Sequence, residues 1–196
     1  MVLILKNLKN YQFESKGNFY KNAVVREPIH KIDLTPVTED CLAMDCRNTT
    51  FESESMDCIM FDPPFLATQG KSLENKTSII TTRFGYYKNM PELYQFYVDS
   101  LKECYRLLKQ NGTLIFKCQD CVNGGRQWMS HCYIHDMAVK IGFYPVDLFV
   151  LLAKNRLNPS WWGKPQHARK YHCYFWVFKK SQSDINYLKN KIVLHY

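Results

Sequence analysis

The residues most suited to chemistry in this chain are the tetrad Asp62-Pro63-Pro64-Phe65, which directly follows the apolar run 58–61. A short apolar run closed by such a tetrad is typical of a buried strand that leads into a rigid loop. Two consecutive prolines fix two φ angles and remove two N–H donors. A carboxylate, free carbonyl groups and an aromatic ring are therefore expected to face a cleft in a preset geometry that suits a planar amine. An ordinary rigid turn is the alternative interpretation.

Further segments stand in a definite order around the tetrad: Met44-Asp45-Cys46-Arg47 and Asp57 upstream, then 105–114, 117–120 and 167–172 downstream. In this order they resemble the amino-methyltransferases over roughly residues 41–180. These are class I S-adenosylmethionine-dependent enzymes that methylate exocyclic amines of nucleic-acid bases, and a D/N/S-P-P-Y/F/W loop is their hallmark. The Asp62 form with its phenylalanine is similar to the loop of bacterial and phage DNA adenine-N6 methyltransferases.

The resemblance implies how the tetrad works. Asp62 and the carbonyl of Pro63 each accept an N–H bond from the base amine, which localises its lone pair for attack on the methyl group. Pro64 keeps the loop rigid and Phe65 stacks on the base, which must be flipped or single-stranded to enter. Adenine N6 in DNA is the expected target, since cytosine-N4 enzymes more often begin the tetrad with Ser. An RNA or rRNA methylase, and a non-catalytic nucleic-acid-binding subunit, remain the alternatives.

The same resemblance implies where S-adenosyl-L-methionine binds. It places Asp45 on the adenine amine of the cofactor, with a backbone N–H from Cys46, and Asp33 on the ribose hydroxyls, unless Asp33 is only a solvated surface acid. The family's F-x-G-x-G loop does not occur before Asp45 or after residue 179. Either 24–28 is a degenerate version of it, with Glu27 as its acid, or a protein partner or homodimer completes the cofactor or target site.

Strands alternate with helices along the chain, which predicts an α/β fold: a Rossmann-like, mostly parallel sheet with an antiparallel last strand. We expect a single domain over 1–196, with 1–22 as an irregular N-terminal segment. Asn89 and Glu92 form a capping box at the start of the first helix, which Asn111-Gly112 stops. A second helix is expected from Trp128 to Lys140, stopped by Gly142. The expected strands cover 23–25, 29–34, 42–44, 58–61, 113–117, 147–153 and 174–179.

A net charge of +8 and an isoelectric point near 9.0 favour a polyanionic partner, DNA with RNA as the alternative. Aromatic and basic side chains that could contact phosphates and stack on bases gather near the end of the chain: Trp162, Lys164, His167, Arg169 and Lys170. The tryptophans could instead cover the edge of the core. Gly124-Gly125-Arg126 is either a phosphate-approaching loop or an ordinary turn.

The remaining features place the chain in the cytoplasm. No apolar stretch reaches the roughly 18 residues that a membrane span needs, and the first residues are too short for a signal peptide. Several of the eight cysteines lie within apolar segments, so reduced thiols are expected. The spacing of Cys118, Cys121, Cys132 and His135 resembles a zinc site. Because the methyltransferase interpretation already explains Cys118, we expect no metal.

Overall fold

The computed structural model describes residues 2–5, 29–36, 38–65, 67, 87–153, 167, 168 and 170–191, with the backbone alone for 2–5 and 187–191. The predicted strand at 23–25 lies outside these residues. The elements follow one another as β1 (Val2–Leu5), β2 (His30–Asp33), β3 (Cys41–Ala43), β4 (Met56–Phe61), α2 (Met90–Leu107), β5 (Leu108–Cys118), β6 (Cys121–Asn123), β7 (Arg126–Trp128), α3 (Ser130–Ile141), β8 (Tyr144–Leu152), β9 (His172–Lys179) and α4 (Gln182–Lys191).

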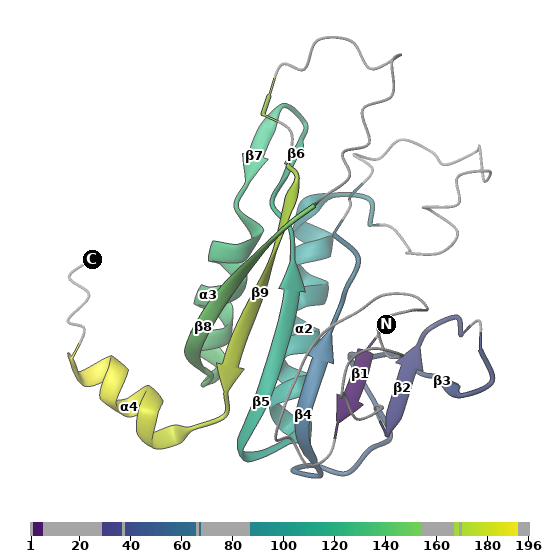
Figure 1. Ribbon diagram of the computed structural model, residues 1–196, viewed down its shortest axis with the longest axis vertical. Coiled ribbons are helices and arrows are strands. Elements are labelled where there is room, and N and C mark those ends of the chain that lie inside the picture. The colour runs from purple at the N-terminus through teal and green to yellow at the C-terminus, as the bar shows by residue number, and fades with distance from the viewer. Residues whose placement is uncertain are drawn as a thin grey trace.

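Seven strands of the described part form one sheet in the order β3-β2-β1-β4-β5-β9-β8 (Figure 1). β2 and β3 are parallel, as are β4 and β5, and β9 is antiparallel to both β5 and β8. The predicted α/β architecture with an antiparallel last strand is therefore confirmed. The expectation of an irregular segment over 1–22 is wrong for residues 2–5. They form β1, because antiparallel ladders to β2 and β4 on both sides hold a Val-Leu-Ile-Leu run of high β-propensity.

Helix α2 is the element that the sequence predicts best. The Asn89 side chain accepts a bond from the backbone N–H of Glu92 at 2.9 Å, and Glu92 in turn accepts one from the N–H of Lys88 at 2.8 Å. Pro91 occupies the first turn, where its missing N–H costs nothing. The apolar side chains at helical spacing are buried on one face: Leu93, Phe96, Tyr97, Leu101, Cys104 and Leu107. The cap and the apolar stripe together explain where the helix begins and what it packs on.

The end of α2 differs from the prediction. The helix ends at Leu107 and β5 begins at Leu108, so Asn111 and Gly112 lie inside a strand instead of stopping the helix. The carbonyls of the last turn are satisfied from a distant part of the chain, since the ammonium group of buried Lys180 donates to Tyr105 O and Leu108 O, each at 2.8 Å. A cation at a helix C-terminus is favourable, and this one arrives only through tertiary contact.

The second helix begins later than predicted. Residues 126–128 pair with 121–123 in an antiparallel hairpin, so Trp128 belongs to a strand and α3 begins at Ser130. Its predicted stop is confirmed at Gly142, which has a φ of 127°. β8 and β9 each begin earlier than predicted, and α4 has no counterpart in the sequence-based expectation.

The hydrophobic core lies between the sheet and the two helices α2 and α3, which Figure 1 shows together behind the sheet. Phe61 of β4 and Phe116 of β5 meet edge to face at 4.9 Å, and Tyr97 of α2 meets Phe116 at 5.6 Å. This aromatic cluster lies directly beneath the point where β4 leaves the sheet. Among the described helices, none is both long and apolar enough to cross a membrane.

Candidate active site

Asp62 lies at the carboxyl end of β4, next to the end of β5. Because Phe61 and Phe116 are partners in the parallel register of β4 and β5, Asp62 and Lys117 are the next neighbours across the two strands. Lys117 Nζ lies 2.9 Å from Asp62 Oδ2, with the two side chains 23% and 27% exposed. The carboxylate is thus held by an ion pair at a place that solvent and ligands can reach. Sequence analysis missed this role of Lys117.

The two prolines are attached to the core rather than loosely exposed. Pro63 is buried, and the carbonyl of Pro64 accepts a hydrogen bond from the hydroxyl of Tyr97 at 2.8 Å. The Tyr97 side chain is fully buried, and burial raises its pKa well above the usual value, so the hydroxyl stays protonated as a donor. Phe65, at the end of the tetrad, is half-buried. Tyr97 of α2 therefore holds the main chain of the loop, and Lys117 of β5 holds its carboxylate.

Asp45 and Cys46 follow β3 and contact the same helix. The backbone N–H of Arg47 bonds Asp45 Oδ1 at 2.9 Å, and its guanidinium bonds Asp45 Oδ2 at 2.6 Å. These hydrogen bonds lower the pKa of Asp45 against the opposing effect of burial. Cys46 Sγ lies 3.7 Å from the hydroxyl of Ser100 on α2, and burial raises the pKa of this thiol. The guanidinium of Arg47 also stands 5.7 Å over the ring of Phe96.

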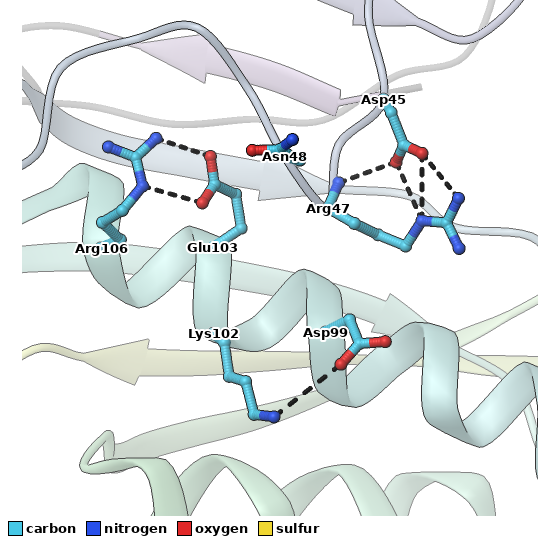
Figure 2. A pocket seen from close by; sticks show the side chains of 7 residues that line it. All are labelled: Asp45, Arg47, Asn48, Asp99, Lys102, Glu103 and Arg106. Carbon is cyan, nitrogen blue, oxygen red and sulfur yellow. Dashed lines mark hydrogen bonds and ion pairs between the residues drawn. The ribbon is translucent and has the colours of Figure 1, made fainter.

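A groove of about 560 Å³ opens beside Asp45 and α2. Figure 2 shows that three ion pairs line it: Asp45 with Arg47, Asp99 with Lys102 and Glu103 with Arg106. A second groove of about 440 Å³ shares Arg47 and Asp99 with the first and continues past Tyr87 and Phe96. Since the three acids and three bases along the first groove are paired, its walls are polar but carry no net charge that would attract an anion.

Asp33 lies at the end of β2, beside the Asp45 loop. Its carboxylate accepts a bond from the N–H of Thr35 at 2.9 Å, and its carbonyl accepts one from the N–H of Met44, also at 2.9 Å. Two acids, Asp33 and Asp45, therefore stand at the carboxyl ends of adjacent parallel strands. In open α/β sheets this is the edge where nucleotides bind. Glu27 lies outside the described residues.

Helix α2 connects the two halves of this site. Phe96 and Ser100 contact the Asp45 loop, and Tyr97 bonds Pro64 of the tetrad. From Phe96 to Ser100 the helix rises by about 6 Å, so both loops are held within roughly one turn. The residues present fit the nucleoside end of S-adenosylmethionine, which needs carboxylate acceptors at this edge. No F-x-G-x-G run for the methionine end occurs among the described residues, whose four glycines stand at positions 112, 124, 125 and 142.

A buried polar cluster that sequence analysis missed lies beyond the end of β5. Asp120 is only 3% exposed, and both of its oxygens lie within 2.9 Å of Nδ1 of His131 in the first turn of α3. Tyr174 of β9 stacks on His131 at 4.2 Å and bonds His172 at 2.9 Å. The one feature of the sequence that could have indicated this cluster is an acid, Asp120, just after a buried strand. The cluster joins the ends of β5, α3 and β9 beside the tetrad.

The expected nucleic-acid residues are only partly described. Trp162, Lys164 and Arg169 lie outside the described residues, whereas His167 is exposed and Lys170 half-buried shortly before β9. β9 begins beside the end of β5, with Tyr174 opposite Cys118. The two described residues therefore lie on the same side of the sheet as the tetrad, and their contact with nucleic acid stays a prediction.

The zinc-like spacing does not produce a cluster of ligands. Cys118 is buried and Cys132 is exposed, while His135 pairs with Asp136 at 3.0 Å. Across the described positions, which include all four candidates, no group of three or more His, Cys, Asp or Glu side chains is arranged to hold a metal. All eight cysteines are described and none is in a disulfide.

Comparison with known proteins identifies the family of this chain. A family model described as DNA methylase, covering N6 and N4 methyltransferases, matches residues 56–195. No curated protein sequence matches the chain. Among solved structures, the cytosine-N4-specific PvuII DNA methyltransferase is similar at a TM-score of 0.50 and 16% identity, over 68% of this chain and 45% of that one. At this identity the likeness supports the fold.

Two further structures give weaker similarity. A putative DNA modification methylase from Thermus thermophilus, complexed with S-adenosyl-L-methionine, has a TM-score of 0.49 and 16% identity over 78% of this chain and 54% of that one. A SAM-dependent methyltransferase from Methanosarcina mazei has a TM-score of 0.42 and 10% identity over 72% and 67%. The chain spans about half the length of the first solved methylases it matches.

Proposed function

Because the family model matches most of its length, this chain belongs to the DNA methylase family, the class I S-adenosylmethionine-dependent N6 and N4 amino-methyltransferases, and on that premise we propose that it methylates adenine N6 in DNA. The observation that carries the proposal is the state of the tetrad. Its carboxylate is held by Lys117 and its backbone by Tyr97, at the carboxyl end of β4. The tetrad begins with Asp rather than Ser, which favours adenine over cytosine.

The proposed chemistry rests on hydrogen-bond acceptors held in place before the substrate arrives. An exocyclic amine is a poor nucleophile, because its lone pair is delocalised into the ring. Asp62 and the carbonyl of Pro63 accept its two N–H groups and so localise the lone pair on nitrogen, while Phe65 stacks on the base. Prearranged groups of this kind lower the barrier through positioning and fixed dipoles. Pro64 contributes through the bond of its carbonyl to Tyr97, which keeps the loop in this arrangement.

S-adenosyl-L-methionine supplies the methyl group on a sulfonium centre. In the proposal, Asp33 and Asp45 hold its ribose and adenine at the ends of β2 and β3, and Cys46 adds a backbone N–H. Arg47 already bonds both oxygens of Asp45, so the adenine amine must share that carboxylate with it or displace it. We assign Glu27 to the methionine end.

The proposed substrate is DNA, with the target base out of the stack, because the acceptors of the tetrad can reach an amine only when its base leaves the duplex. The positive charge of the chain favours the phosphate backbone. We assign contacts with it to five residues: Trp162, Lys164, His167, Arg169 and Lys170.

The chain offers a matched control for a test of the tetrad. β4 and β5 carry a second ion pair at their other end, where Lys109 lies 2.8 Å from Asp57. We expect Asp62→Ala to abolish transfer of labelled methyl groups to DNA. Asp57→Ala breaks a similarly short Asp–Lys pair and should leave the rate of transfer unchanged. Nucleoside analysis of the product should show N6-methyladenine.

Each other outcome contradicts part of the proposal. N4-methylcytosine as the product would overturn the adenine assignment, and transfer to RNA but not to DNA would overturn the substrate. Absence of S-adenosylmethionine binding at millimolar concentration, with nucleic-acid binding retained, would favour a non-catalytic subunit. Equal loss of transfer in both variants would show that Asp62 has only a structural role.

A further inference from the structure

The hairpin of β6 and β7 is a feature that the proposed reaction does not use. Its strands pair Cys121 with Trp128 and Asn123 with Arg126, so Gly124 and Gly125 form a two-residue turn. Both glycines have positive φ, 63° and 70°, which is the geometry of a type I′ turn. A Cβ built on either glycine meets no atom of the described residues within 4 Å. The tip of the hairpin is therefore narrow and is not packed against any described part of the chain.

The hairpin is attached to the rest of the molecule next to the tetrad. The indole N–H of Trp128 donates to Asn123 O at 3.1 Å, and its ring meets Tyr94 of α2 edge to face at 5.6 Å. The side-chain amide of Asn123 donates to Ala67 O at 2.7 Å, only two residues beyond Phe65. Figure 1 shows the hairpin extending past the carboxyl ends of β4 and β5. A molecule that reaches the tetrad from this side comes close to the hairpin.

The hairpin carries one charged side chain, and it is a cation. No Asp or Glu lies between Asp120 and Asp136 in the sequence, and Arg126 is the one charged residue of the hairpin. Arg126 is exposed and has no ion-pair partner among the described residues. Other described cations, such as Lys109 and Lys117 at the two ends of β5, are held by carboxylates. An exposed guanidinium beside a turn without side chains suits a phosphate, because the guanidinium and the main chain of the turn can both approach the phosphate closely.

We propose that the β6–β7 hairpin contacts the sugar-phosphate backbone of the DNA strand that carries the target base. Arg126 bonds a phosphate, and the glycine turn lets the main chain approach the strand. The contact passes to the catalytic loop through Asn123 and Ala67. This inference rests on the proposed function for its partner, and it adds a DNA-contacting element outside the residues that sequence analysis assigned to nucleic acid.

The test measures DNA binding without catalysis. Binding of a fluorescein-labelled duplex is followed by anisotropy over a range of salt concentrations, with the full chain and two variants. Arg126→Gln removes the hairpin charge, and Lys140→Gln removes an exposed charge at the far end of α3. The slope of log K against log salt concentration is negative, and loss of one phosphate contact makes it shallower by about 0.9. We expect that decrease for Arg126→Gln and no change for Lys140→Gln.

Two results would overturn the inference: an unchanged slope for Arg126→Gln, or the same decrease in both variants, which would show only the effect of net charge. Arg126→Lys serves as a third variant, which keeps the charge and should restore most of the slope. The proposed function fails separately. If Asp62→Ala abolishes methyl transfer while Arg126→Gln leaves binding unchanged, the reaction stands without the hairpin contact; if the hairpin variant weakens binding in a chain that transfers no methyl group, the contact stands without the reaction.

Discussion

The hydroxyl of Tyr97 is the point where the loop of the tetrad is fixed to the core, and its removal should slow the proposed reaction as well as destabilise the fold. Tyr97→Phe keeps the ring and its edge-to-face contact with Phe116 but removes the 2.8 Å bond to Pro64 O. Such a bond contributes about 1 kcal/mol to stability. For a domain of this length the loss corresponds to a decrease in Tm of about 2–4 °C. If the whole of it opposes the reactive loop geometry, the rate falls by about fivefold.

Tyr94 provides the matched control on the same helix. Its hydroxyl lies 3.2 Å from Ser130 Oγ and does not contact the loop, and its ring stacks on Tyr133 at 4.1 Å. Tyr94→Phe should therefore destabilise the protein by a similar amount and leave the rate unchanged. The assay is transfer of labelled methyl groups to DNA at saturating cofactor and DNA, with thermal unfolding measured on the same preparations. Equal rates for Tyr97→Phe and Tyr94→Phe would refute the idea that this bond positions the loop.

Two further predictions concern stability. Burial opposes ionisation of Glu103, but hydrogen bonds from Arg106 and Thr49 outweigh burial and lower the pKa of this carboxyl below its usual 4.5. The ionised carboxylate therefore stabilises the folded protein above pH 4.5, and this stabilisation is lost as the pH falls through the lowered pKa. Urea unfolding should show the wild type losing its advantage over Glu103→Gln on acidification, and a constant difference would contradict this. Gly142→Ala should cost about 1–3 kcal/mol, because a φ of 127° is strained for any side chain and the new Cβ lies 3.0 Å from the hydroxyl of Tyr105. Gly124→Ala has a φ of 63° and no described atom within 4 Å of the new Cβ, so it should cost less in the same urea assay; equal costs would show that the contact with Tyr105 adds nothing.

Local patterns predicted the elements that build the site. The apolar run before Asp62 forms β4, and the capping pair Asn89 and Glu92 begins α2. These signals depend on residues within a turn or a strand of one another, so the chain carries them regardless of its fold. Predictions of the ends of elements were less accurate. Lys180 caps α2 from more than 70 residues away, and the pairing of Trp128 in a hairpin delays α3, and neither effect is visible in a local window.

The sequence by itself determined the chemistry offered by this protein: a carboxylate, two prolines and an aromatic ring after a buried strand, in a chain with an excess of positive charge. Only the tertiary structure decided what holds those groups. The register of β4 against β5 brings Lys117 to Asp62 across 55 residues, and the packing of α2 brings Tyr97 to Pro64 across 33. The physical reason is that strand pairing and helix packing bring a side chain to its partner. They join segments that are far apart in the sequence, and no local sequence pattern indicates which segments will meet.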